Sequence, residues 1–181
     1  MGGKVRFYKE RTGERFNGML DLNLNAAIIT CQAVVPHMVK QNSGKLVNIA
    51  SIGGRSPIWT GERISPAIFM AYGISKAGII HFTGLLALEL AEHNINVNCV
   101  APGVVWTPMY EKNTLREITT KPQFNGMTPR EFYEKVIVAG LPLKREVPPA
   151  DIGDAVVFLV SEKGRNITGQ AINVDAGSRP S

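Results

Sequence analysis

Three short apolar segments, separated by long stretches with helical periodicity, constrain the fold of this 181-residue chain most strongly. The segments are Leu46–Ile49, Ile95–Val100 and Ala171–Val174. Each is too short for a helix and carries Val, Ile or Leu, which is typical of a buried strand. Strands that alternate with helices form parallel β-α-β units. The pattern therefore predicts an α/β fold with a doubly wound parallel sheet, in a single domain of residues 1–181.

Three longer stretches predict the helices around this sheet. In Phe16–Gln41, apolar residues recur every three to four positions, which is the period of a helix with one buried face. Pro36 lies inside this stretch and predicts a kink, because proline lacks the N–H that the helix needs. We expect the other two helices at residues 72–93 and 149–160.

Two stretches lack a clear period. Residues 53–70 are rich in Gly, Pro and Ser, which predicts a loop. Residues 107–143 are mixed, and we expect a short helix at 129–138 with Thr128 as its N-cap. Aromatic and methionine side chains in and beside both stretches either anchor the loops or line an apolar substrate pocket under a mobile lid at 107–143. They are Trp59, Phe69, Met70, Trp106, Met109, Tyr110, Phe124, Met127, Phe132 and Tyr133.

Tyr72 and Lys76 stand four residues apart at the start of the second predicted helix. This spacing puts both side chains on one helix face. A phenol has a reference pKa of about 10, and an adjacent ammonium favours its ionised form. The pair can therefore exchange a proton with a substrate near neutral pH. Alone, the same spacing is also typical of an exposed tyrosine that packs on a lysine stem.

Five short motifs around this pair occur in an order that resembles the short-chain dehydrogenase/reductase family, over about residues 21–177. They are Asp21-Leu22-Asn23-Leu24, Val47-Asn48-Ile49-Ala50-Ser51, Tyr72-Gly73-Ile74-Ser75-Lys76, Asn98-Cys99-Val100-Ala101-Pro102-Gly103 and Gly169-Gln170-Ala171-Ile172-Asn173-Val174-Asp175-Ala176-Gly177. The resemblance implies a Rossmann-like sheet and an NAD(P)-dependent oxidoreductase, which interconverts an alcohol and a ketone by hydride transfer.

The resemblance also implies four catalytic residues. Tyr72 gives or takes the hydroxyl proton, and Lys76 lowers the pKa of the phenol and binds the nicotinamide ribose. Ser51 orients the substrate carbonyl, and Asn23 holds a water in a proton relay. Without the resemblance, Ser51 is also compatible with a turn serine that bonds to the backbone, and Asn23 with an ordinary asparagine on a helix surface.

The resemblance implies that Tyr72 and Lys76 also contact the nicotinamide end of NAD or NADP, together with four further residues. Pro102 and Gly103 match the family's turn beside the nicotinamide. Val105 would offer its backbone to the carboxamide, and Thr107 its hydroxyl to the amide or to a phosphate. The alternative for the first two is a plain Pro-Gly turn. Nothing in the sequence chooses between the two dinucleotides.

The chain departs from the family at its amino-terminal side. The family's Gly-rich phosphate-binding turn after a first strand has no counterpart here, because Gly2 and Gly3 follow no strand and precede no apolar helix. At roughly 30 residues for each β-α-β unit, about 90 residues of the pattern are missing. We therefore expect a truncated fold without its first strands and helices. Two other interpretations remain: a non-catalytic fragment that keeps the oligomerisation helices, and a pseudoenzyme that binds another ligand.

One spacing also differs from the family's common pattern. Ser51 and Tyr72 lie 21 positions apart, several more than usual. The extra residues fall at 57–66, where we expect a protrusion that affects substrate choice.

Charge, cysteines and hydropathy limit the partners. The net charge is +5, but no Lys/Arg run exceeds two residues, so we expect no nucleic acid partner. Cys31 and Cys99 lie in apolar runs and predict buried free thiols in a reducing compartment, and neither they nor the three histidines show metal-ligand spacing. With no signal peptide and no apolar run of membrane length apparent, we expect a cytoplasmic protein without membrane contact. The resemblance implies a homodimer or homotetramer.

Overall fold

A three-stranded parallel sheet lies at the centre of the computed structural model, which describes residues 13–56 and 66–180. Its strands are β1 (Gly44–Ile49), β2 (Ile95–Pro102) and β3 (Ala171–Val174), in the order β1-β2-β3. The middle strand β2 is almost entirely buried, as expected for a central strand covered on both faces, and its two asparagines, Asn96 and Asn98, hydrogen-bond to the backbone before β3. All three predicted strands are confirmed, with β1 and β2 two residues longer than expected.

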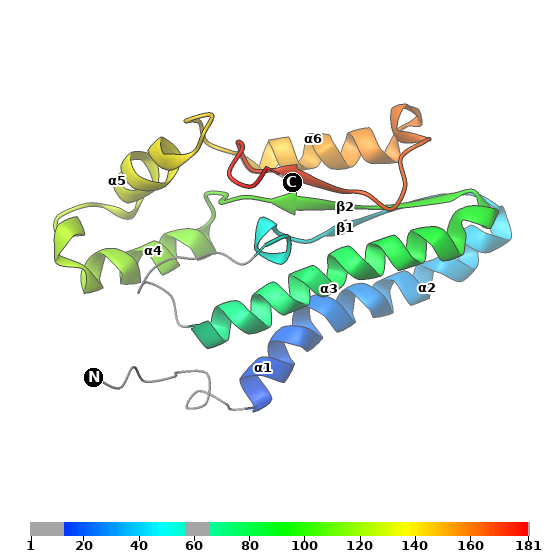
Figure 1. The fold of residues 1–181 in the computed structure, drawn as a ribbon, viewed down its shortest axis with the longest axis horizontal. Helices are drawn as coiled ribbons and strands as arrows, with labels where there is room; N and C mark the ends of the chain where they lie inside the picture. The colour runs from blue at the N-terminus through cyan, green and yellow to red at the C-terminus, as the bar shows by residue number, and fades with distance from the viewer. Residues whose placement is uncertain (1–12, 57–65, 181) are drawn as a thin grey trace.

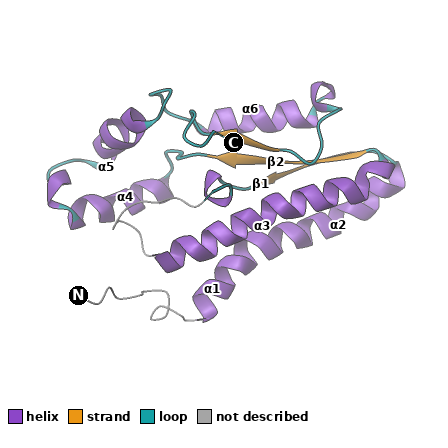
Figure 2. Cartoon of the chain, viewed as in Figure 1, coloured by secondary structure: helices purple, strands orange, loops and turns teal. Residues whose placement is uncertain are grey.

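Helices cover both faces of the sheet (Figures 1 and 2). On one face, α2 (Ala26–Gln41) and α3 (Pro66–Leu90) lie side by side, and on the other α6 (Pro149–Val160) packs against all three strands. This arrangement confirms the predicted α/β class, and α6 has the predicted bounds. β1 and β3 are the two edge strands of the described sheet.

The first helical stretch runs from α1 (Gly13–Leu20) through a π-helical turn at Asp21–Asn25 into α2. The helix direction changes between α1 and α2 in Figure 1, whereas α2 continues through Pro36 without a break. The irregular turn therefore lies at Asp21–Asn25, and the kink predicted at Pro36 does not interrupt the helix. A helix accommodates an extra residue in a π turn when packing on both sides fixes its neighbours, and such turns are frequent at functional sites.

The loop predicted at 53–70 was wrong at both ends. A 3₁₀ turn occupies Ile52–Gly54, and α3 begins at Pro66, six residues before the expected start. Proline is favoured in the first turn of a helix because its missing N–H has no partner there in any case. The helix also ends earlier than expected, at Leu90, and a 3₁₀ turn follows it. The expected protrusion at 57–66 lies outside the described residues, apart from Pro66.

The stretch at 107–143 is largely helical. Besides the expected helix, here α5 (Pro129–Phe132) and a π-helical turn at Tyr133–Ile137, it contains α4 (Pro108–Thr120), which was not predicted. Thr128 caps α5 as predicted, in a capping box with Glu131 in which each side chain bonds to the other residue's backbone N–H.

Apolar side chains of this stretch form a small core of their own. Ile118, Phe124 and Phe132 are buried together, and the Phe124 and Phe132 rings meet edge to face at 4.8 Å. This packing favours the anchoring interpretation for these two aromatic residues. Met109, in contrast, is 73% exposed, so the anchoring interpretation has no support at this residue.

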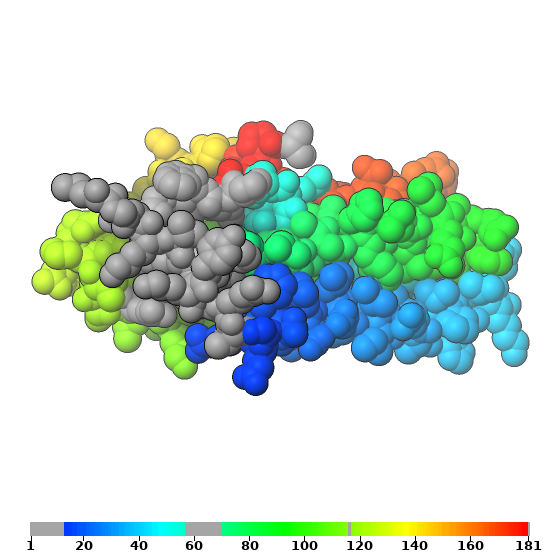
Figure 3. All heavy atoms as spheres, turned by 60° about the horizontal axis from the view of Figure 1, so that its bottom comes forward, coloured from blue at the N-terminus to red at the C-terminus, as the bar shows by residue number. Residues whose placement is uncertain are grey.

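Two helical stretches, Gly13–Gln41 and Met70–His93, are long and apolar enough to cross a membrane by length and composition alone, so the expectation that no such run exists was wrong. Core helices of proteins that cross no membrane pass the same test. Here α2 and α3 bury one side against the sheet. Figure 3 shows the first helical stretch in blue and α3 in green side by side on the surface. Large apolar side chains are also exposed on this helical layer. The exposed large apolar residues of this layer are Leu22, Ile29, Met70, Ile74, Leu85 and Leu88.

Both cysteines are buried and free, as expected. Burial raises the pKa of both thiols, and in Cys31 the hydrogen bond to Asn48 opposes this effect. Neither is therefore a reactive thiolate.

Asn98 joins β2 to the turn that leads into β3. Its amide donates to the Ile167 carbonyl at 2.7 Å and its oxygen accepts from the Gln170 N–H at 3.0 Å, while the residue is 1% exposed. We expect Asn98→Leu to lower the free energy of unfolding by about 2–4 kcal/mol, because two buried backbone groups lose their partners. Urea unfolding of both proteins measures this. The control is Asn113→Leu on the exposed side of α4, where a surface change should stay within about 0.5 kcal/mol. Equal losses in both variants would contradict the assigned role.

Candidate active site

Two of the predicted site residues, Ser51 and Gly103, lie where the parallel strands end, at the same edge as Asp175. Ser51 follows β1 by two positions, Gly103 directly follows β2, and Asp175 directly follows β3. Parallel strands end at the same edge of a sheet, and open α/β sheets bind ligands at this carboxyl edge. The described fold therefore brings these separate segments of sequence to one edge.

Lys76 connects helix α3 to the end of β1. Its ammonium donates to the Ile49 carbonyl at 3.0 Å and lies 5.8 Å from the centre of the Tyr72 ring. Partial burial lowers the pKa of Lys76 below its usual value, with a smaller opposing effect from Cys99. The lysine thus sits between the tyrosine one helical turn earlier and the strand that leads to Ser51.

The hydroxyl of Ser51 is fixed by the turn that it begins. Ser51 caps the 3₁₀ turn at Ile52–Gly54, and its Oγ accepts from the Gly53 N–H at 3.1 Å. A hydroxyl that accepts one bond can still donate its own proton. The arrangement therefore satisfies the turn and leaves Ser51 able to donate a hydrogen bond to a carbonyl oxygen.

Asn23 lies in the π-helical turn, and the next residue of this turn, Leu24, packs on α3. A Cβ atom on Gly78 would lie 2.9 Å from a Leu24 methyl carbon, so this glycine allows the close approach. The Asn23 amide donates to the Met19 carbonyl at 3.2 Å, within its own helix. The structure thus brings the segment of Asn23 against the helix that carries Tyr72 and Lys76, but the amide N–H is bonded to Met19.

The turn after β2 packs closely against the end of β3. The Gly103 N–H donates to the Val174 carbonyl at 2.9 Å, and a Cβ atom on Gly103 would lie 2.8 Å from the Asp175 Cα. Any side chain at Gly103 would therefore displace backbone. The close packing against β3 thus requires glycine at position 103, whether or not the Pro102–Gly103 turn also contacts the nicotinamide as predicted.

Thr107 is the N-cap of α4. Its Oγ accepts from the Tyr110 N–H at 3.2 Å, and Pro108 occupies the first helical position. A threonine followed by proline, with an acidic residue in the first turn, was the sequence pattern that could have predicted α4. Val105, which precedes Trp106, is half-buried in the segment that joins β2 to this cap.

A cluster centred on Arg130 holds this segment, and sequence reasoning missed it. The Arg130 guanidinium lies 5.3 Å from the Trp106 ring and 5.4 Å from the Tyr133 ring, and it donates two bonds to Glu146. The buried Tyr133 donates its hydroxyl to the Val104 carbonyl at 3.3 Å. The cluster therefore ties α5 and the segment before α6 to the turn after β2.

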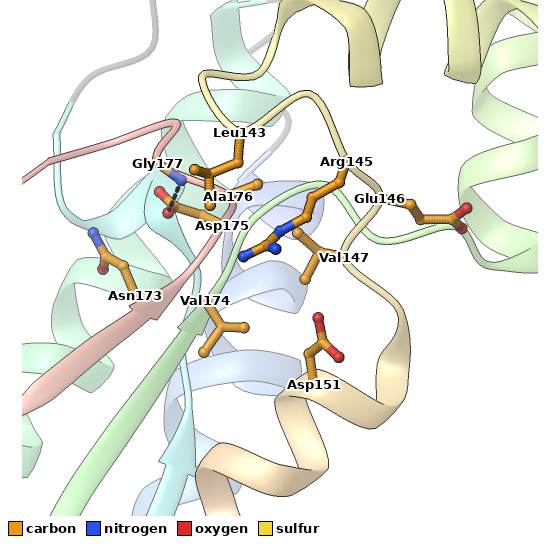
Figure 4. A pocket seen from close by; sticks show the side chains of 10 residues that line it. All are labelled: Leu143, Arg145, Glu146, Val147, Asp151, Asn173, Val174, Asp175, Ala176 and Gly177. Atoms are coloured by element: carbon orange, nitrogen blue, oxygen red, sulfur yellow. Dashed lines mark hydrogen bonds between the residues drawn. The ribbon is translucent and has the colours of Figure 1, made fainter.

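A shallow pocket of about 250 Å³ lies near the carboxyl end of β3 and the first turn of α6, and it contains none of the predicted site residues. Figure 4 shows its lining, with Asp175 accepting from the Gly177 N–H. Lys76 and Tyr72 lie instead on α3, which covers the other face of the sheet. We therefore do not assign this pocket to the substrate.

Comparison with known proteins identifies the family. The family model described as enoyl-(acyl carrier protein) reductase matches residues 4–179. The chain belongs to the short-chain dehydrogenase/reductase family. It is 36% identical over 170 residues to an acetoacetyl-CoA reductase of an Acinetobacter species, and 34% identical over 166 residues to the 3-oxoacyl-[acyl-carrier-protein] reductase FabG of Thermotoga maritima. A structure of L-sorbose reductase from Gluconobacter frateurii, complexed with NADPH and L-sorbose, matches with a TM-score of 0.82 and 29% identity.

These short-chain dehydrogenase/reductase relatives are longer than the chain. The matches cover 94% and 91% of this chain but 59% and 57% of the two reductases, and 100% of this chain but 64% of the sorbose reductase. The chain therefore spans less than two thirds of the length of each. Family members use NAD or NADP as cofactor, and the comparisons leave the choice between them open.

Proposed function

We propose that the site formed by Ser51, Tyr72 and Lys76 is that of an NAD(P)-dependent oxidoreductase that interconverts an alcohol and a ketone. The observation that carries this proposal is the position of Lys76, whose ammonium bonds to the end of β1 and lies beside the Tyr72 ring. The Lys76 side chain thus links the helix that carries Tyr72 to the strand end that precedes Ser51. In a tyrosine-lysine pair that is only an exposed helix face, the lysine would point to solvent and make no hydrogen bond to a strand.

Each residue then has one task. Tyr72 gives the hydroxyl proton in reduction and takes it in oxidation, Lys76 stabilises the phenolate, and Ser51 donates a hydrogen bond that orients the carbonyl. Asn23 supports the proton relay from the π-helical turn beside α3. The dinucleotide supplies hydride chemistry when bound, and this chain's residues position and polarise the substrate.

The residues present fit the nicotinamide end of the cofactor. A partly buried ammonium at the carboxyl edge of the sheet suits ribose hydroxyls, which accept hydrogen bonds. Pro102, Gly103, Val105 and Thr107 would complete this end, with Thr107 also capping α4. We further propose that the helical stretch at 107–143 covers the substrate as a lid held by the Arg130 cluster, and that the reaction takes place in the cytoplasm.

A second candidate is a non-catalytic member that associates through its helical layer. It is favoured by the apolar side chains exposed on α3 and on the π-helical turn and α2, among them Leu88 at 80% and Leu22 at 75%. Both candidates predict a homodimer or homotetramer, so oligomeric state alone does not separate them. Only the oxidoreductase predicts turnover of a ketone with NADH or NADPH.

The deciding experiment measures oxidation of NADH and NADPH with a panel of ketones that includes an acetoacetyl thioester and L-sorbose. Both the 181-residue chain and a chimera preceded by the unmatched upstream part of the Thermotoga maritima relative are assayed. We expect turnover in the chimera and its loss in the Ser51→Ala variant. A chimera that binds dinucleotide and reduces no ketone would refute the oxidoreductase and leave the non-catalytic member.

A further inference from the structure

The turn that carries Ser51 lies directly against the backbone of α3, and Gly54 is where the two segments meet. A Cβ atom at Gly54 would lie 2.5 Å from the Lys76 carbonyl carbon, 2.6 Å from the Ala77 nitrogen and 2.8 Å from the Lys76 oxygen. These are backbone atoms, so rotating a side chain cannot relieve the contact. The turn can approach α3 this closely only because residue 54 has no side chain.

The contact falls at Lys76 itself, so it bears directly on the proposed site. Ser51 stands three residues before Gly54, and the Gly54 N–H donates to the Ser51 carbonyl at 2.9 Å. Lys76 in turn donates to the carbonyl of Ile49, two residues before Ser51. The segment from Ile49 to Gly54 therefore meets α3 at two points. Lys76 donates a hydrogen bond to Ile49, and Gly54 packs closely against the α3 backbone.

A second glycine and an arginine extend this contact. A Cβ atom at Gly73 would lie 3.3 Å from the Gly53 carbonyl oxygen, so α3 also approaches the turn next to Tyr72. On the other side, Arg55 donates to the Asn173 side chain of β3 at 3.0 Å. The turn therefore contacts α3 on one side and is hydrogen-bonded to β3 through Arg55, so an added methyl group at Gly54 would push the turn against these contacts.

We propose that Gly54 is a positioning residue, whose missing side chain lets the turn seat against α3 and so fixes Ser51 relative to Lys76 and Tyr72. This inference rests on the proposed function for its meaning, although the contact itself can be measured without turnover. Displacing the turn would also be expected to expose Lys76, whose ammonium is partly buried and bonds to the strand end next to the turn. The titratable and charged groups around this contact include Tyr72, whose ring lies 5.8 Å from the Lys76 ammonium, Arg55 in the turn, and Cys99 on β2.

Three Gly→Ala variants form a graded test on the 181-residue chain. Gly54→Ala adds a methyl group at 2.5 Å from backbone, Gly73→Ala adds one at 3.3 Å, and Gly84→Ala, on the same helix, adds one with no atom within 4 Å. The readout is the titration of the Lys76 ammonium by NMR of chains labelled with ¹³Cε-lysine, with the resonance identified by its loss in Lys76→Arg. Circular dichroism confirms that each variant is folded.

We expect the pKa of Lys76 to rise toward its usual value in Gly54→Ala, to rise less in Gly73→Ala, and to stay unchanged in Gly84→Ala. If Gly54→Ala does not fold, the comparison of Gly73→Ala with Gly84→Ala decides. The same Lys76 titration in wild type and in every folded variant at Gly54 or Gly73 would overturn the inference. A graded response in a chain whose chimera shows no turnover would keep the positioning contact and refute the proposed function, so the two failures are distinguishable.

Discussion

Tyr72→Phe is expected to remove nearly all turnover from an enzyme that contains this segment, while the dinucleotide still binds. Phenylalanine keeps the ring beside the Lys76 ammonium and removes the hydroxyl that would exchange the proton. Positioned acid–base groups contribute about 10²–10⁴-fold to rate, so turnover should fall by about that factor. The variant also keeps the half-buried packing of the ring on α3, so the loss should not come from unfolding.

The measurement compares steady-state rates and dinucleotide affinity of the chimera described above with and without the substitution. Tyr110→Phe is the matched control, because Tyr110 packs at 6.3 Å from Trp106 and 5.7 Å from Tyr133 in the cluster beside α4. Burial raises the pKa of Tyr110 to about 12, so its hydroxyl stays protonated at neutral pH. Substantial turnover in Tyr72→Phe, or an equal loss in Tyr110→Phe, would refute Tyr72 as the acid–base residue.

Elements whose sequence carries a local pattern were predicted well. Ala171–Val174 and Pro149–Val160 have the expected bounds, since a short apolar run and a proline at the first helical position both identify their element without neighbours. The capping box at Thr128 is similarly local. α4 was not predicted, because its start is marked only by Thr107 and Pro108, and Thr107 also matches a cofactor-binding position of the family.

Features that depend on distant residues could not be predicted from spacing. Arg130 and Glu146 are 16 residues apart and meet only because the segment before α6 returns to α5. The close approach at Gly54 depends on α3, whose contact point lies more than twenty residues later. The π-helical turn at Asp21–Asn25 leaves no trace in the apolar period, since it inserts one residue into a helix whose packing decides where the insertion falls.

The 181-residue chain by itself leaves one edge of the described sheet open at β1. β1 pairs with β2 alone in the described part of the chain, so its other side presents unpaired backbone groups. Ile49 on this strand is 44% exposed, and Val157 on α6, which packs over β1, is 64% exposed. An open apolar strand edge templates pairing with another chain. We therefore expect the chain to self-associate, and Ile49→Lys to reduce association more than Leu143→Lys, a control on an exposed loop residue.

Weak dinucleotide binding by this chain is expected from the few groups that can contact the ligand. The proposed contacts, Tyr72, Lys76, Val105 and Thr107, reach only the nicotinamide end. Binding energy from the remote parts of a ligand holds its reacting part in place, so a chain limited to these contacts should lose both affinity and rate. We expect NADH and NADPH to bind weakly or not at all, with little dehydrogenase activity. Calorimetric titration with both dinucleotides, together with light scattering, measures the two expectations at once. Binding at micromolar concentration by a monodisperse monomer would show that these contacts and this edge suffice without a further strand or helix.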